Sequence, residues 1–278
     1  MKRLTLWMAT LGLLLGVPRA SMAEEETRIV LDGSTTVGPL AKAFAEYYMQ
    51  QNKGVNISVS ESGSGNGAKG IINSTCDIGN MSRAMKDEEV KAAEEKGVKP
   101  MAHTICMDGV AIIVHPSNPV KALTLAQLKD IYLGKVKKWN EVGGPALPIV
   151  RISRDTNSGT YETFEGKVMK GDRIAAIVEY VGSNGAMRGR VMSTPGAIGY
   201  VGLGFVDRSV KPLEIEGVLP TKETVSTAKY PISRPLFMYT NGEPKAETHL
   251  AHFVNLYKTA KGREITDAIG FVPLPEGK

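Results

Sequence analysis

The order of apolar and polar residues along the chain predicts alternating strands and helices. Residues 28–31 and the alternating stretch 55–60 read as strands, and 109–115 is an apolar strand. Residues 37–50 repeat with a helical period. Short connections between such elements are typical of an open α/β sheet.

The remaining elements continue this alternation. Residues 77–80 are predicted to form the end of a short strand. Later strands are expected at 148–152, 197–201 and 236–239. Helices are expected at 66–72, 86–95, 124–131, 159–169, 245–258 and 262–267. No fixed-period repeat or low-complexity segment interrupts the pattern.

The N-terminus has the features of a cleaved signal peptide. Lys2 and Arg3 precede the apolar run 4–17, which is short for a membrane span, and Ser21-Met22-Ala23 supplies small residues at a cleavage site. We therefore expect residues 1–23 to be removed and the mature protein to be periplasmic.

Processing also changes the charge. The formal net charge is +5, and loss of Lys2, Arg3 and Arg19 lowers it to +2. A nucleic-acid-binding domain would carry a dense basic patch, so we expect no nucleic-acid partner.

Two cysteines, Cys76 and Cys106, would enter an oxidising compartment. A bridge between them would close a loop of about 30 residues and stabilise the fold by roughly 3 to 4 kcal/mol. The alternative is two buried thiols, and the sequence leaves both open.

Three loops share a composition of hydroxyl residues and glycine between a predicted strand and a predicted helix. They are 32–36 (DGSTT), 61–67 (ESGSGNG) and 153–160 (SRDTNSGT). A helix start presents unpaired N–H donors and a partial positive charge, so it can bind an anion. Such residues are also ordinary helix caps, but three such loops in one α/β chain favour an anion site.

Charged residues in and near these loops refine the hypothesis. Arg154 can give charge-assisted hydrogen bonds to an oxyanion. A carboxylate such as Asp77 or Asp108 could accept a hydrogen bond only from a ligand that keeps a proton, which favours hydrogen phosphate over sulfate. A strand-end cap for Asp77 and a turn for Asp108 are equally good interpretations.

Motifs for other functions are incomplete. Residues 65–70 match G-x-G-x-x-G formally, but a dinucleotide is not expected outside the cytosol. His249 and His252 are three apart on a helix with nothing nearby to complete a metal site. We expect no cofactor, no metal and no enzymatic activity.

The motifs together resemble the phosphate-binding proteins of phosphate-specific ABC transporters. Five segments, in the family's order and covering nearly the whole mature chain, carry the resemblance: 32–36 with Pro39, 62–65, 77–83 (DIGNMSR), 154–160 and 195–201 (PGAIGYV).

The resemblance implies a type II periplasmic-binding-protein fold: two α/β lobes, joined by two hinge crossings, with ligand in the cleft between them. Lobe 1 would comprise 24–112 plus 236–278, and lobe 2 would comprise 113–235. Inorganic phosphate and the membrane permease of an ABC importer would be the partners of a monomer. The expected phosphate-binding residues are Ser34, Thr35, Thr36, Gly63, Ser64, Gly65, Ser82, Arg83, Asp108, Arg154, Ser158, Gly159 and Thr160.

The chain departs from the family in its third motif. Some members have Asp where Ser82 stands, and that carboxylate accepts the proton of the ligand. Here the acceptor is either moved, for example to Asp108, or missing, and Arg83 is either a second anion ligand or the partner of a carboxylate. Binding of sulfate, molybdate or tungstate is therefore an alternative.

A secreted phosphatase would need a base or metal beside a Ser or Thr nucleophile, and the four histidines form no recognisable arrangement for this.

Overall fold

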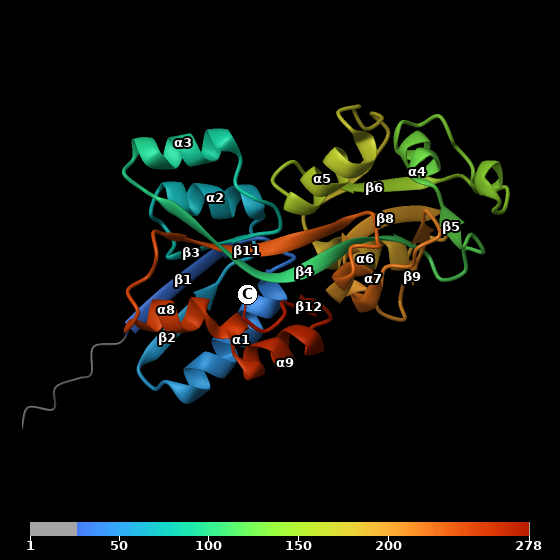
Figure 1. The fold of residues 1–278 in the computed structure, drawn as a ribbon. Coiled ribbons are helices and arrows are strands. Elements are labelled where there is room, and N and C mark those ends of the chain that lie inside the picture. Colours follow the sequence, from blue (N-terminus) through green and yellow to red (C-terminus); the bar gives the residue numbers. More distant parts are fainter. Residues whose placement is uncertain (1–26, 278) are drawn as a thin grey trace, which may run out of the picture.

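The computed structural model describes residues 27–277, in which strands and helices alternate (Figure 1). The strands are β1 Thr27–Gly33, β2 Val55–Val59, β3 Ile78–Met81, β4 Pro100–Val114, β5 Ala122–Leu123, β6 Val150–Arg154, β7 Glu179–Val181, β8 Ala197–Gly202, β9 Lys211–Pro212, β10 Glu214–Ile215, β11 Ser233–Asn241 and β12 Val272–Pro273. The helices are α1 Gly38–Gln51, α2 Ser64–Ile72, α3 Asp87–Glu95, α4 Leu125–Tyr132, α5 Gly159–Phe164, α6 Asn184–Met192, α7 Lys222–Ser226, α8 His249–Val254 and α9 Ala260–Ala268.

The main sheet has the order β2-β1-β3-β11-β4-β8-β6-β7, with β9 and β12 pairing along β4. β1 runs parallel to β2 and β3, and β6 runs parallel to β7 and β8. The long strands β4 and β11 are antiparallel to each other and lie between these two parallel sets. The sheet therefore has two α/β halves, one built on β1–β3 and one on β6–β8.

Each half has its own core, and β4 contributes to both. Ile105 and Cys106 belong to the core that includes α1, whereas Val110 and Ile112 belong to the core that includes α4. On β11, Leu236 belongs to the core that includes α1, whereas the residues just before the strand belong to the core that includes α4. The chain thus crosses twice between the halves, and the lobe limits at 113 and 236 stay a prediction.

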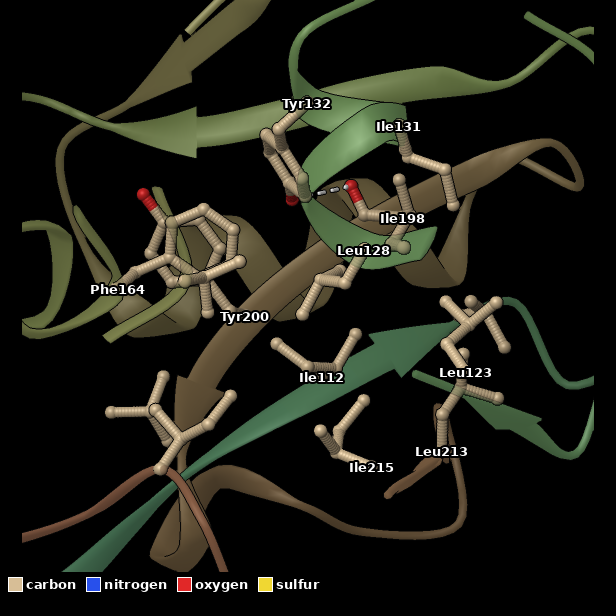
Figure 2. Packing of buried hydrophobic residues seen from close by; sticks show 14 of the residues in the cluster. Ile112, Leu123, Leu128, Ile131, Tyr132, Phe164, Ile198, Tyr200, Leu213 and Ile215 are labelled. Atoms are coloured by element: carbon tan, nitrogen blue, oxygen red, sulfur yellow. Dashed lines mark hydrogen bonds between the residues drawn. The ribbon is translucent and has the colours of Figure 1, made fainter. Parts of the chain in front are cut away.

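The core of the half built on β6–β8 fixes the strand that carries Arg154. Phe164 of α5 stacks on Tyr200 of β8 with ring centroids 4.2 Å apart, and Tyr132 packs against Phe164 (Figure 2). The Tyr200 hydroxyl accepts a hydrogen bond from the Arg154 backbone N–H at 3.1 Å and lies 2.7 Å from the Ser153 hydroxyl. This apolar packing therefore holds the end of β6 next to the start of α5.

The predicted elements agree with the structure except in length, and several short elements are not predicted. The predicted strand 109–115 is the end of the longer β4, because the pairing with β11 extends it back to Pro100. Helix α2 begins at Ser64 rather than near Asn66. Helices α6 and α7 are not predicted, because their short, polar sequences have no strong apolar period, and neither are the short strands β5, β7, β9, β10 and β12.

Of the two alternatives for the cysteines, the structure has the two buried thiols and not the bridge. Cys76 and Cys106 are both free and buried, and they belong to different apolar clusters, Cys76 with α2 and α3 and Cys106 with α1. Packing in separate clusters keeps the thiols apart. The predicted signal peptide, 1–23, lies outside the described residues. No helix within 27–277 is both long enough and apolar enough to cross a bilayer.

Candidate anion-binding site

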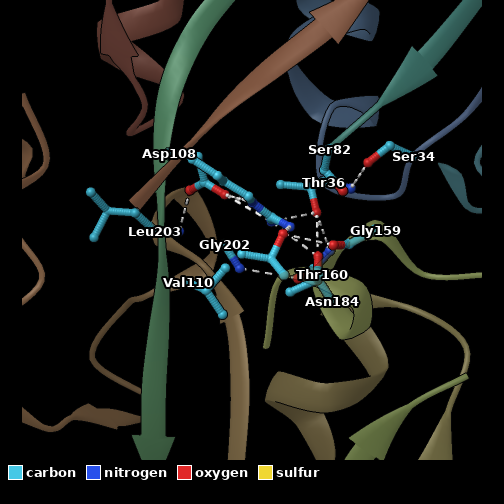
Figure 3. A network of polar contacts seen from close by, with 12 residues as sticks. Ser34, Thr36, Ser82, Asp108, Val110, Gly159, Thr160, Asn184, Gly202 and Leu203 are labelled. Carbon is cyan, nitrogen blue, oxygen red and sulfur yellow. Dashed lines mark hydrogen bonds and ion pairs between the residues drawn. The ribbon is translucent and has the colours of Figure 1, made fainter. Parts of the chain in front are cut away.

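Loops from the two halves converge on one small polar site with only about 110 Å³ of space between its atoms. Pockets for organic ligands are usually several hundred Å³ in volume, so nothing larger than a small ion suits this site. Its lining is made of hydroxyl residues, glycines and one arginine: Ser34, Thr35, Thr36, Gly63, Ser64, Ser82, Arg154, Ser158, Gly159 and Thr160. Figure 3 shows part of this lining, with Ser34, Thr36 and Ser82 facing Gly159 and Thr160.

The loop after β1 brings three hydroxyls to the start of α1. The Ser34 hydroxyl oxygen accepts hydrogen bonds from the backbone N–H groups of Thr36 at 3.1 Å and Val37 at 3.3 Å. Gly33 makes this approach possible, because its φ of +131° suits glycine and a Cβ there would lie 2.2 Å from the Asn80 carbonyl oxygen.

The second loop contributes Ser64 at the start of α2. Gly63 precedes it with φ +105°. The Ser82 backbone N–H, at the end of β3, donates to the Ser64 hydroxyl oxygen at 3.0 Å, and the two hydroxyl oxygens are 3.2 Å apart. Both hydroxyls contact Gly159 of the opposite half, where a Cβ would come within 2.6 Å of each.

The third loop supplies the start of α5. The Ser158 hydroxyl caps the helix by accepting from the Tyr161 N–H at 3.2 Å. The next residues, Gly159 and Thr160, therefore present their backbone N–H groups at the cavity. The Thr160 hydroxyl lies 3.0 Å from the Thr36 hydroxyl, so the two halves meet at the cavity wall.

Arg154 is a buried cation with an unused donor in this wall. The residue is 1% exposed, and its Nε and Nη2 donate to the Val181 and Gly182 carbonyls. Nη2 also lies 3.3 Å from the Thr35 hydroxyl oxygen, whereas Nη1 has no partner. Burial lowers the pKa of Arg154 from 12.5 to about 10. A bound anion would supply both the missing acceptor and the missing counter-charge.

Two residues that the sequence reading missed orient the threonine hydroxyls. The Asn184 side-chain amide donates to Thr35 at 3.0 Å and to Thr36 at 2.9 Å, and its oxygen accepts from the Gly202 N–H. Arg234 Nη2 donates to Thr160 at 3.0 Å and to Thr36 at 3.3 Å. Asn184 follows a Ser and precedes a Gly, the same composition as the three recognised loops.

Asp108 does not line the cavity, contrary to the expectation that it receives the ligand's proton. Its Oδ2 accepts from Arg234 Nε at 3.0 Å and Nη2 at 2.9 Å, and its Oδ1 accepts from the Leu203 N–H at 2.8 Å (Figure 3). Asp108 is fully buried, and burial raises its pKa even though Arg234 opposes that shift. Its role in this structure is to pair with Arg234.

Arg83 and Gly65 also lie outside the lining. Arg83 is held by both oxygens of Glu89, at 2.6 and 2.7 Å, and by Glu162 of the opposite half. It is thus the partner of carboxylates and is not directed at the cavity. The Gly65 N–H donates to the Asn157 carbonyl at 3.0 Å, which joins the halves beside the site. Asp77 accepts from the Val30 N–H, as a strand-end cap does.

The arrangement is suited to binding a small anion. Helix starts from both halves converge on one space, and a buried guanidinium with a spare donor faces it. No carboxylate of the described residues lines the cavity, and within 27–277 no three His, Cys, Asp or Glu side chains gather as metal ligands. Two α/β halves, crossed by two strands and closed over one small site, define a binding protein with the type II periplasmic-binding-protein fold.

Comparisons with known proteins agree with this class. Residues 20–259 match the model of the PBP superfamily domain. The phosphate-binding protein PstS of Staphylococcus saprophyticus is 36% identical, with 96% of this chain and 86% of that protein covered. Protein SphX of Synechococcus elongatus is 31% identical over 93% of this chain and 81% of its own.

A solved structure is similar throughout. It is a Clostridium perfringens protein with bound phosphate, described as a phosphate ABC transporter substrate-binding protein, with TM-score 0.83 and 33% identity, covering 90% of this chain and 100% of that one. The chain therefore belongs to the PBP superfamily and, within it, to the family of the PstS phosphate-binding proteins.

Proposed function

We propose that this protein is the extracytoplasmic component of an ABC importer and that it captures inorganic phosphate in the cavity between its halves and delivers it to the membrane permease. The observation that carries this proposal is the buried Arg154, whose Nη1 has no partner within a wall of hydroxyls and helix starts. Relatives with at least 30% identity are named as phosphate-binding proteins.

The proposed mechanism of capture is closure of the two halves over the ion. Thr35 and Thr36 belong to one half, and their hydroxyls hydrogen bond to Arg154 and Asn184 of the other. An anion that bridges the same groups would favour the closed arrangement, because burial strengthens each of its charged hydrogen bonds. Release to the permease then requires the halves to separate.

We further propose that the protein has no catalytic role. A serine or threonine nucleophile needs a base within hydrogen-bond reach. The contacts described for Thr35, Thr36 and Thr160 are to guanidinium, amide and hydroxyl groups, and Asp108 is occupied by Arg234 and Leu203. The proposal includes a periplasmic, monomeric protein with the lobe limits predicted above and without a nucleic-acid partner.

Calorimetric titration of the anion-stripped protein with phosphate tests the proposal. Wild type should bind one phosphate per chain. Gly159→Ala should abolish binding, because the added Cβ would lie 2.5 Å from the Ser64 hydroxyl and 2.6 Å from that of Ser82. Gly166→Ala is the matched control, since a Cβ there meets nothing within 4 Å. Absence of phosphate binding by wild type would refute the proposed function.

A further inference from the structure

We infer that Glu162 of α5 is a positioning residue for phosphate capture: it pairs with Arg83 and Lys86 of the opposite half and thereby holds Gly159 and Thr160 over the bound ion. Glu162 lies outside the cavity lining. Its role rests on the proposed function, because it concerns how long the ion is retained and not which atoms contact it.

Glu162 lies in the first turn of the helix that borders the cavity. Its backbone N–H donates to the carbonyl of the cap residue Ser158 at 3.1 Å. Gly159 and Thr160, within the same turn, line the cavity. The hydrogen-bonded turn makes these residues move together. A contact that fixes Glu162 to the opposite half therefore also fixes this part of the cavity wall.

Both carboxylate oxygens of Glu162 contact cations of the other half. Oε2 forms an ion pair with Arg83 Nε, and Oε1 lies 3.4 Å from Lys86 Nζ. The side chains of Glu162 and Arg83 are 16% and 9% exposed, so the pair is largely shielded from water. A shielded pair attracts more strongly than a fully exposed one, and salt screens it less.

Other contacts close the same edge of the cavity. The stem of Arg83 packs on Gly159, where a Cβ would lie 3.1 Å from Arg83 Cγ. Nearby, the Gly65 N–H donates to the Asn157 carbonyl of the opposite half at 3.0 Å. The two halves are thus joined at this edge by contacts that do not involve the ion.

Glu89 makes the contact between Arg83 and Glu162 reversible. It binds the Arg83 guanidinium through both of its oxygens, at 2.6 and 2.7 Å, and belongs to the same half as Arg83. Arg83 therefore keeps a counter-charge when the halves separate, and Glu162 passes into water. The pair can stabilise the closed form without leaving a buried unpaired charge in the open form.

Glu162 has two opposite effects on the binding of an anion. Its negative charge lies one turn from Gly159, so neutralising it should strengthen binding by charge alone. As the partner of Arg83 it stabilises closure, so neutralising it should weaken binding. Loss of a shielded pair mainly speeds dissociation, whereas a change of exposed charge mainly alters association. The sign of the effect and the rate that changes therefore separate the two.

Glu162→Gln should release phosphate about tenfold faster than wild type, with an association rate within about twofold of wild type. Displacement of labelled phosphate by an excess of unlabelled phosphate gives the dissociation rate, and calorimetry gives the affinity. The urea midpoint of the anion-free protein should stay unchanged, because Glu162 is unpaired in the open form.

Glu165→Gln is the matched control. It removes the same charge from the residue that follows α5, and in the described part of the chain Glu165 is not an ion-pair partner of Arg83 or Lys86. This variant should release phosphate at the wild-type rate or more slowly, since only the repulsion is reduced.

Arg83→Gln provides a second check. It should also speed release, and adding Glu162→Gln to it should change the rate by less than about twofold, because only the half-exposed Lys86 is left as a partner. Unchanged or slower release from Glu162→Gln, a lower urea midpoint, or effects of the two variants that multiply would overturn the inference while phosphate capture stands. If wild type binds no phosphate, the proposed function fails and this role fails with it.

Discussion

Arg234 Nη2 lies 2.9 Å from Asp108 Oδ2, and the two residues face each other across β11 and β4 in the centre of the molecule. Their side chains are 3% and 0% exposed. The pair joins the strands at the point where both change from one core to the other, and Arg234 extends to Thr36 and Thr160 in the cavity wall. The pair thus connects the crossing between the halves to the proposed site.

Removing the carboxylate of this pair should be costly. Asp108→Asn leaves a buried guanidinium without its counter-charge, which typically destabilises a protein by about 3 to 5 kcal/mol. Urea denaturation of the anion-free protein measures this. The double variant Asp108→Leu with Arg234→Met should lose less than Asp108→Asn alone, because no unpaired charge is left. A loss below about 1 kcal/mol in Asp108→Asn would contradict this role for the pair.

Asn184→Leu should weaken phosphate binding by roughly 1 to 3 kcal/mol, since the Thr35 and Thr36 hydroxyls lose the donor that orients them. Calorimetry gives the affinity. Ser183→Ala is the control, because it removes the cap of the same helix and leaves the amide in place. Equal losses of affinity in both variants would mean that α6 as a whole, and not the amide, matters.

Arg154→Met should lose about 2 to 5 kcal/mol of phosphate binding, because a desolvated charged partner is removed. Its free energy of unfolding without anion should nevertheless stay within about 1 kcal/mol of wild type, since the cost of burying the guanidinium offsets its hydrogen bonds. The lowered pKa, about 10, reflects that cost. Parallel denaturation and titration measure both quantities, and a large loss of stability would assign Arg154 a structural role.

The buried thiols predict a pH dependence. Burial raises the pKa of Cys76 from 9.0 to about 12, so the folded protein holds this proton more firmly than the unfolded chain does. The resulting stability is complete below pH 9 and is lost as the pH rises towards 12.

The difference in unfolding free energy between wild type and Cys76→Ala should therefore shrink over that range. Thiol titration provides a second check: both cysteines should react after unfolding without reductant, and neither in the native protein. A missing thiol signal in unfolded protein would indicate a bridge.

The sequence revealed the parts of the site that lie close together in the chain. Ser34, Ser64 and Ser158 each lie between a strand and a helix, in a loop of recognisable composition. All three line the cavity. Arg234 could not be found in this way, because its partner Asp108 is 126 residues away and only strand pairing brings them together. Asn184 lies in a loop-to-helix segment of the same composition, but it was not recognised because its helix has only a weak apolar period.

The distinction between Arg83 and Arg154 also depended on tertiary structure. Arg83 follows β3 and Arg154 ends β6, each precedes a helix, and their local sequences make both equally good candidates for binding an anion. The structure surrounds Arg83 with Glu89 and Glu162, whereas Arg154 contacts carbonyls and keeps one nitrogen free. Counter-charges from distant segments decide which guanidinium is available to a ligand.

The most direct test of the account is a crystal structure of the protein grown with phosphate. The account predicts one tetrahedral ion enclosed between the halves, with Arg154 Nη1 and the Thr160 hydroxyl within hydrogen-bond distance and one oxygen against Ser82. Phosphate bound elsewhere, or an ion that leaves Arg154 Nη1 without a partner, would contradict it.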